Sequence, residues 1–399
     1  MKAIKPYYLF LFSAVIAFTI SSCKKSDAVK PSLTLINAVS VTGGYGDTIT
    51  LRGTNLPTAH NPVVTVNDQS FEIAEVTSTS FKAVVPKMVG SGKVSVKVDG
   101  ITYDGPDFVY KYKAVVTTLA GSGDGGSQDG LGGAASFNCP WGTVADDNGD
   151  LYIADCYNRL IRKITPTGTV STIHIPITIN GATFFSPNNI ALDKATHTLY
   201  VTDFNAHLLK INADNSMVVI YDGPSATSGI AVGSDGFLYM ANNITSTIFK
   251  LSTDGSTATP IATNIVTPRN IIFDKSDNMY VAGYDPIKGQ AAIFQVARDG
   301  YNRVIYDDPD FKGWEIAVDR AGNFYEADHF NNVIKIIDKN GKIAIIAGSG
   351  NAEDVDGVGL AASFNGPQGL AIDADGNLYV STYNYDTGGG NKIRKIVVY

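Results

Sequence analysis

Two carboxylates and an imidazole lie close together in one short stretch of the chain, at Glu326, Asp328 and His329. A further carboxylate, Glu315, stands on the apolar segment that precedes them. If the two segments pair as neighbouring strands, we expect Glu315 to lie across from Asp328, and Trp314 across from His329. Carboxylates beside a histidine could donate and accept protons in a lyase or hydrolase reaction.

The segment that carries Glu326 is one of six similar segments. Each copy has an apolar strand, a turn of Asp, Asn and Gly, a strand that reads Leu-Tyr-x-x, and a third apolar strand. The second strands are LYIAD (151–155), LYVTD (199–203), LYMAN (238–242), MYVAG (279–283), FYEAD (324–328) and LYVST (378–382). Strand repeats with a period of about forty residues are typical of a β-propeller. Glu326 is the exception at its position, where the other copies have Ile153, Val201, Met240, Val281 and Val380.

In a propeller, one end of the central channel gathers the start of every first strand and the end of every second strand. At these positions the sequence supplies aromatic, amide and charged side chains. The candidate ligand-binding residues are Trp141, Asn188, Asn189, Arg269, Asn270, Trp314, Glu315, His329 and Gln368. Aromatic rings stack on sugar faces while amides and carboxylates bind hydroxyls, so this set predicts a carbohydrate ligand. The alternative is that the two tryptophans plug the channel or pack between blades.

Metal and cofactor chemistry find little support in the sequence. Only His207 and His329 fall near the channel mouth, so a three-histidine zinc site is not indicated, and we predict no metal and no cofactor. Asp155, Asp203 and Asp328 end their strands and could ring a cation, but an Asp here more often binds the amides of its own loop. No G-x-S-x-G or H-E-x-x-H motif occurs.

Two stretches carry a family resemblance. The segments PWGTVADDNGDLYIADCYNRLIRKI (140–164) and GPQGLAIDADGNLYVSTYNYDTGGGNKIRKI (366–396) resemble NHL repeats, which implies a six-bladed propeller over 114–399. GDTITLRGTNL (46–56) and GKVSVKVDGITYDGPDFVY (92–110) resemble an IPT/TIG domain, which implies an immunoglobulin-like spacer over 32–112. The predicted fold is all-β, a sandwich followed by a propeller. NHL propellers include binding scaffolds, lyases and hydrolase-like proteins, so the resemblance does not decide the chemistry.

The N-terminus resembles a bacterial lipoprotein signal. Lys2 and Lys5 precede an apolar run at 7–20, and Ile-Ser-Ser-Cys ends at Cys23. The resemblance implies removal of 1–22, lipidation of Cys23, a tether over 23–31 and an outer-membrane anchor. The alternative is an ordinary secretory signal. The net charge of −7 and the absence of a basic block do not suggest nucleic-acid binding.

The chain ends predict how the propeller closes. The segment 114–126 parallels 342–354, whose first part is the outer strand of the fifth blade. We therefore expect 115–121 to supply the outer strand of the sixth blade, because the chain stops directly after that blade's third strand. Cys139 and Cys156 flank the first hairpin at the same end, and they could form a disulfide or remain buried thiols.

These patterns together favour a binding protein over an enzyme. The predicted protein captures a carbohydrate at the channel mouth as part of a polysaccharide-capture system, since lipoproteins with IPT/TIG domains resemble such glycan-capture components. One alternative is a lyase or hydrolase that uses Glu315, Glu326, Asp328 and His329. Another is a scaffold that binds protein partners of the cell envelope.

Overall fold

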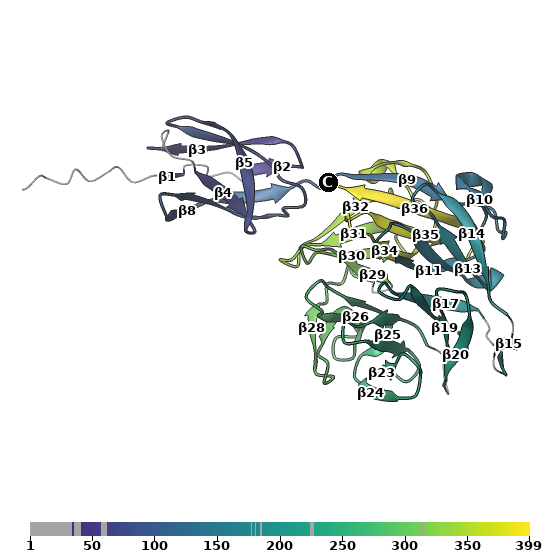
Figure 1. Ribbon diagram of the computed structural model, residues 1–399. Coiled ribbons are helices and arrows are strands. Elements are labelled where there is room, and N and C mark those ends of the chain that lie inside the picture. Colours follow the sequence, from purple (N-terminus) through teal and green to yellow (C-terminus); the bar gives the residue numbers. More distant parts are fainter. Residues whose placement is uncertain are drawn as a thin grey trace, which may run out of the picture.

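The computed structural model describes residues 34–35, 41–56, 62–176, 178–179, 181–183, 186–223, 227–312 and 315–399, which form two all-β units (Figure 1). The predicted leader, Cys23, the tether and Trp314 lie outside these residues. No helix within the ranges just given is long and apolar enough to cross a membrane.

The first unit is an immunoglobulin-like sandwich of short strands. They are β1 Thr34–Leu35, β2 Val41–Gly43, β3 Thr48–Thr54, β4 Val63–Val66, β5 Gln69–Val76, β6 Ser80–Val84, β7 Gly92–Val98 and β8 Ile101–Tyr110. The order is β1-β3-β6-β5-β4-β7-β8-β2. Alternate residues of β3, β4, β6 and β7 face the core, as the sequence pattern predicts. In β7, for example, Val94, Val96 and Val98 are buried.

The second unit is a propeller of six blades, each built on four antiparallel strands. The blades, from the inner to the outer strand, are the following. Blade 1 has β11 Pro140–Ala145, β12 Leu151–Asp155, β13 Leu160–Ile164 and β14 Thr169–His174. Blade 2 has β17 Pro187–Asp193, β18 Thr198–Asp203, β19 His207–Ile211 and β20 Met217–Asp222. Blade 3 has β21 Ile230–Val232, β22 Phe237–Asn242, β23 Thr247–Ser252 and β24 Ala258–Ala262.

The remaining three blades follow the same plan. Blade 4 has β25 Val266–Phe273, β26 Met279–Asp285, β27 Gln290–Val296 and β28 Asn302–Tyr306. Blade 5 has β29 Glu315–Val318, β30 Phe324–Asp328, β31 Val333–Ile337 and β32 Ile343–Ala347. Blade 6 has β34 Pro367–Ile372, β35 Leu378–Tyr383, β36 Gly390–Val398 and β9 Ala114–Ala120.

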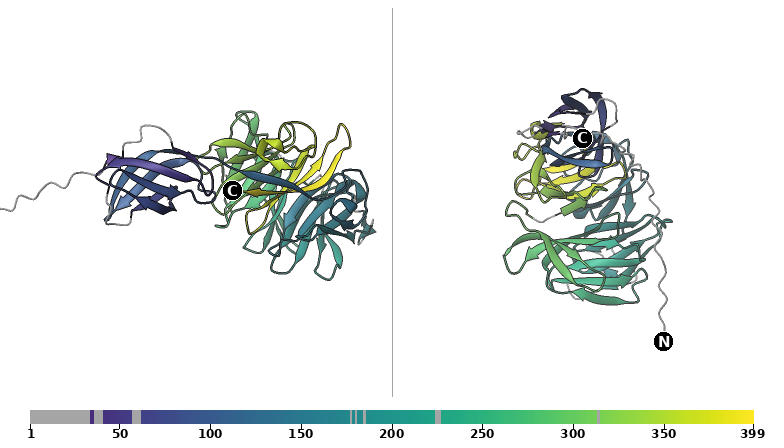
Figure 2. Two further views of the ribbon diagram at one scale, coloured as in Figure 1. Left: turned by 90° about the horizontal axis from the view of Figure 1, so that it is seen from above. Right: turned by 90° about the vertical axis from the view of Figure 1, so that its left-hand side faces the viewer.

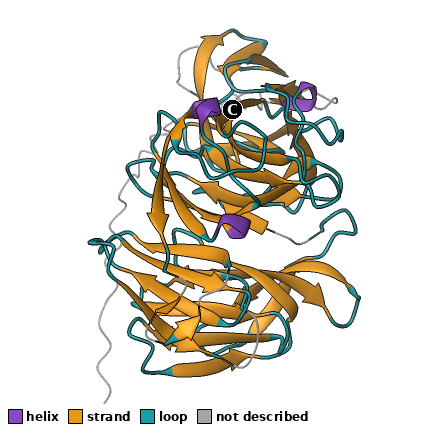
Figure 3. Cartoon of the chain, turned by 90° about the vertical axis from the view of Figure 1, so that its right-hand side faces the viewer, coloured by secondary structure: helices purple, strands orange, loops and turns teal. Residues whose placement is uncertain are grey.

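Short elements decorate the blades. The strand β10 Gly130–Leu131 extends blade 1, β33 Gly357–Val358 extends blade 6, and β15 Thr178–Ile179 pairs with β16 Ala182–Thr183. Helical turns in the described part of the chain are limited to η1 Gly132–Ala134, η2 Cys156–Asn158 and η3 Gly359–Ala361 (Figure 3). The fold is therefore a strand scaffold whose loops carry its variable side chains.

The two ends of the propeller segment close the ring together. Strand β9 pairs antiparallel with β36, from Ala120 opposite Ile393 to Ala114 opposite Val398 (Figure 1). This arrangement confirms the closure that the sequence predicts. Blade 6 therefore has its full set of four strands. Val116 of β9 is buried in the core that blades 5 and 6 share.

A tyrosine and an aspartate explain why the repeat has its fixed spacing. In blades 4 to 6 the Leu-Tyr-type strand places its tyrosine hydroxyl on the carboxylate of the turn Asp, at 3.2 Å for Tyr280 on Asp274 and 3.0 Å for Tyr379 on Asp373. The same carboxylate accepts the amides of its own turn, such as that of Asn377 at 2.8 Å. The turn and the strand are thereby held in one geometry.

The sandwich lies beside the outer part of the propeller, next to the end of β36 (Figure 2). Lys339 Nζ donates to the backbone oxygen of Asn67 at 3.2 Å, and Asn340 Nδ2 donates to that of Ser91 at 2.9 Å. The rings of Tyr45 and Tyr399 stack with their centroids 6.0 Å apart. Met88 and Tyr112 also pack against the core of blades 5 and 6, so the contact between the two units is partly polar and partly apolar.

Candidate functional site

A chain of aromatic side chains runs along one end of the central channel. Trp141 contacts Phe204 and Tyr385, with ring centroids 5.8 and 6.1 Å apart. Tyr385 contacts His329 at 5.6 Å, and His329 contacts Phe330 at 5.7 Å. Tyr383 contacts Tyr385, and Tyr157 contacts Tyr383. We call this whole set the aromatic rim. Its members are Trp141, Tyr157, Phe204, His329, Phe330, Tyr383 and Tyr385.

Much of the aromatic rim faces solvent. Phe330 is 63 % exposed, Tyr157 54 %, Tyr385 42 % and Phe204 39 %, whereas Trp141 is half-buried. The residues of the rim come from blades 5, 6, 1 and 2. They lie at or just after the ends of the second strands, or at the start of an inner strand. Contiguous exposed rings on a soluble domain indicate a surface that binds something apolar or a sugar face.

Part of this surface can be predicted from the sequence. The sequence predicts Trp141 and His329 as ligand-binding residues, and both contact Tyr385 in the rim. Phe204, Phe330 and Tyr385 were missed. Phe204 directly follows the Asp that ends β18, and the other two stand two residues beyond the ends of β30 and β35, so the repeat position could have identified them.

Several predicted ligand-binding residues are instead buried in contacts within the protein. Asn188 Nδ2 donates to the backbone oxygen of Thr227 at 3.0 Å, and Gln368 Nε2 donates to that of Tyr383 at 2.9 Å. The Tyr385 hydroxyl donates to Gln368 Oε1 at 3.3 Å, so the buried Gln368 amide helps to hold Tyr385 in the rim. Arg269 is half-buried, and this burial lowers its pKa.

Glu315 lies inside the channel, bound by amides from two other blades. Asn189 Nδ2 donates to one of its carboxylate oxygens at 3.1 Å, and Asn270 Nδ2 donates to the other at 2.6 Å. Burial raises the pKa of Glu315 to about 8, against the opposing effects of the Asn189 hydrogen bond and the charge of Arg269. The inner strands are crowded at this level, since a Cβ on Gly369 would meet the Trp141 oxygen at 1.9 Å.

The prediction that Glu315 lies across from Asp328 is wrong. Glu315 pairs with Ala327, and Ile316 pairs with Glu326. The tight turn sets this register, because Asp319 and Asn323 are hydrogen-bonded across it at 3.0 Å. The carboxylates are therefore not gathered in one corner with His329.

Glu326 and Asp328 belong to a buried ionic cluster inside blade 5. Lys335 Nζ lies 2.5 Å from Asp328 Oδ2 and 3.4 Å from Glu326 Oε2, and all three side chains are buried. The Lys312 amide also donates to Glu326 at 2.5 Å. Lys335 takes the place that Arg162 and Arg394 take in blades 1 and 6, where each arginine binds aspartates. The cluster ties strands and loops together.

The strand-ending aspartates anchor their own loops, as the sequence favoured. Asp155 accepts the amide of Asn138 at 2.8 Å and the side chain of Asn158 at 2.8 Å. Asp328 accepts the amide of Asn331 at 3.0 Å. No group of three or more His, Cys, Asp or Glu side chains in the described ranges is arranged to hold a metal ion.

Cys139 and Cys156 are two free thiols in the structure, both buried. They pack with Tyr383 and Trp141 directly beneath the aromatic rim. A hydrogen bond with Cys156 and burial raise the pKa of the Cys139 thiol.

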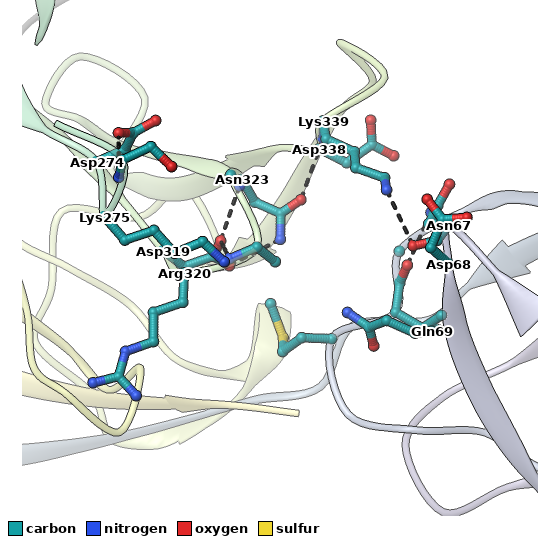
Figure 4. A pocket seen from close by; sticks show the side chains of 16 residues that line it. Asn67, Asp68, Gln69, Asp274, Lys275, Asp319, Arg320, Asn323, Asp338 and Lys339 are labelled. Atoms are coloured by element: carbon teal, nitrogen blue, oxygen red, sulfur yellow. Dashed lines mark hydrogen bonds between the residues drawn. The ribbon is translucent and has the colours of Figure 1, made fainter. Parts of the chain in front are cut away.

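Two of the cavities lie toward the end of the propeller that faces the sandwich. One, of about 430 Å³, lies between the two units (Figure 4). Its aspartates serve their own turns, for example Asp319, which accepts the amides of Ala321 and Asn323. A second cavity, of about 310 Å³, is the central channel itself and is lined by the inner strands of all six blades.

The fold and these sites define an immunoglobulin-like domain joined to a six-bladed propeller. Residues 31–110 match the model of the IPT/TIG domain, and residues 137–164 match the model of the NHL repeat. The sandwich thus matches an IPT/TIG domain, and the first blade of the six-bladed propeller matches an NHL repeat. No curated protein matches its sequence.

Solved structures share the arrangement. A Bacteroides thetaiotaomicron protein of unknown function is 19 % identical with a TM-score of 0.61, over 92 % of this chain and 100 % of that one. An auxiliary nutrient binding protein of the same species is 18 % identical with a TM-score of 0.54, over 90 % and 98 %. Another, from Bacteroides ovatus, is 17 % identical with a TM-score of 0.53, over 91 % and 99 %. At these identities the likeness is one of fold.

Proposed function

We propose that the protein captures a carbohydrate on its aromatic rim while anchored to the outer membrane through a lipid at Cys23. The observation that carries the proposal is the run of exposed and half-buried rings from Phe204 to Phe330 across four blades. Neighbouring rings of the rim meet edge to face or tilted, with interplanar angles of 58° to 84°, so each exposed ring offers its own face or edge to an apolar sugar face. Two structures of similar fold are described as auxiliary nutrient binding proteins, which supports a capture role.

The ionic cluster of blade 5 favours binding over catalysis. A general acid or base needs a group that can reach substrate, but Glu326 and Asp328 are fully buried and share one lysine. His329 lies in the rim instead, where burial lowers its pKa and favours the neutral imidazole at neutral pH. A neutral ring can stack and hydrogen-bond with a sugar.

The test is a glycan-array screen with the full chain, followed by titration calorimetry on the best glycan. Tyr385→Ala and Trp141→Ala should each weaken binding by about 1–3 kcal/mol, the usual range for a ring at the centre of a binding surface. Tyr301→Ala is the matched control, because Tyr301 is 70 % exposed but lies in blade 4, outside the rim. Its binding should be unchanged.

Two results would overturn the proposal. One is the absence of saturable binding to any glycan of the array, and the other is normal binding by both rim variants. Thermal melting of each variant separates a lost contact from a lost fold, and Tyr385→Ala should melt close to the wild type because its ring is partly solvated. Binding of an envelope protein that depends on Tyr385 would instead identify a scaffold.

A further inference from the structure

The outer edge of blade 5 is built differently from the outer edges of blades 1 and 6. In blade 6 the short strand β33 covers the edge of β9, where Gly357 pairs with Val116. In blade 1 the short strand β10 covers the edge of β14, where Gly130 pairs with Val170. The sheet of blade 5 ends at β32, and no strand in the described ranges pairs with its outer edge (Figure 1).

Blades 2 to 4 also have four strands, but blade 5 differs from them in its third strand. The residue opposite the second-strand position of Glu326 is a cation in three blades, namely Arg162, Lys335 and Arg394, and is Leu209, Phe249 or Phe294 in the others. The two arginines bind the loop that supplies the fifth strand. Blade 5 therefore has the kind of residue that this loop binds, without the fifth strand.

The end of that loop is present in blade 5. Arg162 donates to the backbone oxygen of Ser136 at 2.8 Å, and Arg394 donates to that of Ser363 at 2.9 Å. Each serine precedes a buried phenylalanine, at Phe137 and Phe364. Lys335 donates in the same way to the backbone oxygen of Asp310, which precedes the buried Phe311.

The earlier part of the loop is what blade 5 lacks. In blade 6, Asp356 stands directly before β33 and accepts hydrogen bonds from Arg394 at 2.8 Å and Thr118 at 2.9 Å. In blade 1, Asp129 stands directly before β10 and makes the same contacts. The connection to blade 5 has only residues 307–309 between β28 and the aspartate that precedes its phenylalanine, so it cannot supply a strand.

A cavity of about 650 Å³ lies beside β32, where the missing segment would run. Ile343 and Ile345 of β32 line one side of it, and Lys335 and Asp310 line another. Leu360, from the loop that leads to blade 6, completes the wall. A strand laid along β32 would therefore enter a hollow that already exists.

The apolar side chains at this hollow indicate what the occupant should carry. Ile345 pairs with Lys335 at the position where Thr118 pairs with Arg394 in blade 6. That threonine is half-buried and hydrogen-bonded, whereas Ile345 is 51 % exposed and Leu360 is 63 % exposed. Covering these two side chains favours an incoming segment with an apolar residue.

The charges at the hollow favour a basic residue where the built-in segments have aspartate. Lys335 already lies 2.5 Å from Asp328 and 3.4 Å from Glu326, so a further carboxylate would be repelled. In this corner the carboxylates of Asp308, Asp310, Glu326 and Asp328 outnumber the ammonium groups of Lys312 and Lys335, while Asp307 is paired with Lys288. A lysine stem can lie along Ile345 while its ammonium group reaches the exposed Asp310.

We propose that the outer edge of β32 binds an extended segment of a partner protein, which adds a fifth strand to blade 5. The segment pairs with the backbone of β32, places an apolar residue on Ile345 and Leu360, and places a lysine or arginine beside Asp310. Main-chain pairing supplies affinity in this mode of recognition, and the side chains supply specificity.

The test uses fluorescein-labelled peptides and anisotropy titrations with the full chain. The probe is the chain's own segment 127–135 bearing Asp129→Lys, and the unchanged segment is its matched control. The lysine peptide should bind saturably and at least about tenfold more tightly than the control. Adding Leu131→Pro to the lysine peptide should abolish binding, because proline removes a backbone donor from the strand.

Two protein variants locate the site. Ile345→Lys should weaken binding of the lysine peptide at least about tenfold, through like charge and lost apolar contact. Ile305→Lys is the matched control, because Ile305 is exposed on β28, the outer strand of blade 4, and binding should be unchanged. Both variants should melt close to the wild type, since both side chains are solvent-exposed.

Hydrogen exchange gives an independent measurement on the wild type. The bound lysine peptide should slow exchange of the backbone amides of 343–345. Protection of β20, β24 or β28 instead, equal binding of the lysine and aspartate peptides, or no saturable binding of the lysine peptide would each overturn the proposal. Self-association of the chain that is lost in Ile345→Lys, without peptide binding, would show that the edge pairs with a second copy and would also overturn it.

Discussion

The two ends of the central channel differ in how they are built. The rim end is built mainly from residues of the loops that follow the second strands, and most of its rings are exposed and irregularly placed. The end near the sandwich is a tube of inner-strand side chains that repeats from blade to blade. Loops can vary without disturbing the scaffold, so the rim is suited to selecting a ligand. The tube is constrained by packing, and Glu315 lies at the start of β29, where Asn189 and Asn270 bind its carboxylate.

The largest effect should come from opening the ring, because both ends of the channel exist only while it is closed. Val116 lies buried in β9, so Val116→Asp would place an unpaired charge between blades 5 and 6. We expect the free energy of unfolding to fall by about 4 kcal/mol or more, with loss of binding at the rim.

Urea unfolding followed by circular dichroism measures this loss. The matched control is Thr117→Asp, one residue away on the exposed side of the same strand, which should change stability by less than about 0.5 kcal/mol. Equal effects of the two variants would show that β9 does not close a cooperative ring.

A smaller effect, confined to the rim, should follow from Lys335→Met. The change leaves Glu326 and Asp328 buried without their cation, and breaking such a cluster costs about 3 kcal/mol or more. Since Asp328 also holds the amides of Phe330 and Asn331, the rim loop should loosen and glycan binding should weaken.

Two comparisons make this prediction specific. Lys163→Met removes a partly exposed pair with Asp150, at 2.7 Å, and should cost less than about 1 kcal/mol. Adding Glu326→Val, the residue found in blades 2, 4 and 6, to Lys335→Met should recover part of the stability, because one buried charge is removed with its partner. A double variant as unstable as Lys335→Met alone would contradict the ionic account.

The pH dependence of stability distinguishes the channel end from the rim end. Burial raises the pKa of Glu315 from 4.5 to about 8, so the folded protein keeps a proton that the unfolded chain releases. The resulting contribution to stability is complete below pH 4.5 and is lost as the pH rises toward 8. Its slope is at most about 1.4 kcal/mol per pH unit.

Glu315→Gln has no such proton to lose. The free energy of unfolding of the wild type, relative to this variant, should therefore decline between pH 5 and pH 8. Urea unfolding at each pH unit gives the difference, and parallel profiles for the two proteins would show that Glu315 titrates normally.

The scaffold could be predicted from the sequence because it depends on local repetition. The strand spacing, the turn aspartates such as Asp319 and the closure through β9 all follow from patterns that recur in the chain. The resemblances to IPT/TIG and NHL sequences added the fold of each unit, and both family models match.

The site could be predicted only in part, since it depends on contacts between distant residues. Asn189 and Glu315 are 126 residues apart and meet only through the geometry of the closed ring. The predicted pairing of Glu315 with Asp328 was wrong by one residue. The register is set by the turn that Asp319 and Asn323 make, and hydrophobicity alone does not predict it. In the observed register Glu315 lies in the channel and Asp328 lies in the ionic cluster.

The smallest effect concerns the thiols beneath the rim, which should be inert while the ring is folded. Cys139 and Cys156 are buried under Trp141 and Tyr383, and the raised pKa of Cys139 makes its thiolate rare. Iodoacetamide reacts with thiolates, so the native protein should show almost no labelling of either residue, whereas urea should expose both. Peptide mapping by mass spectrometry resolves them from Cys23.

A cross-linked peptide containing Cys139 and Cys156 in the unreduced protein would contradict the two-thiol state and establish the disulfide that the sequence left open. Labelling of both residues in the folded protein would show that the rim opens on the timescale of the reaction, and its rings would then be a less rigid surface than the contacts of Trp141 indicate.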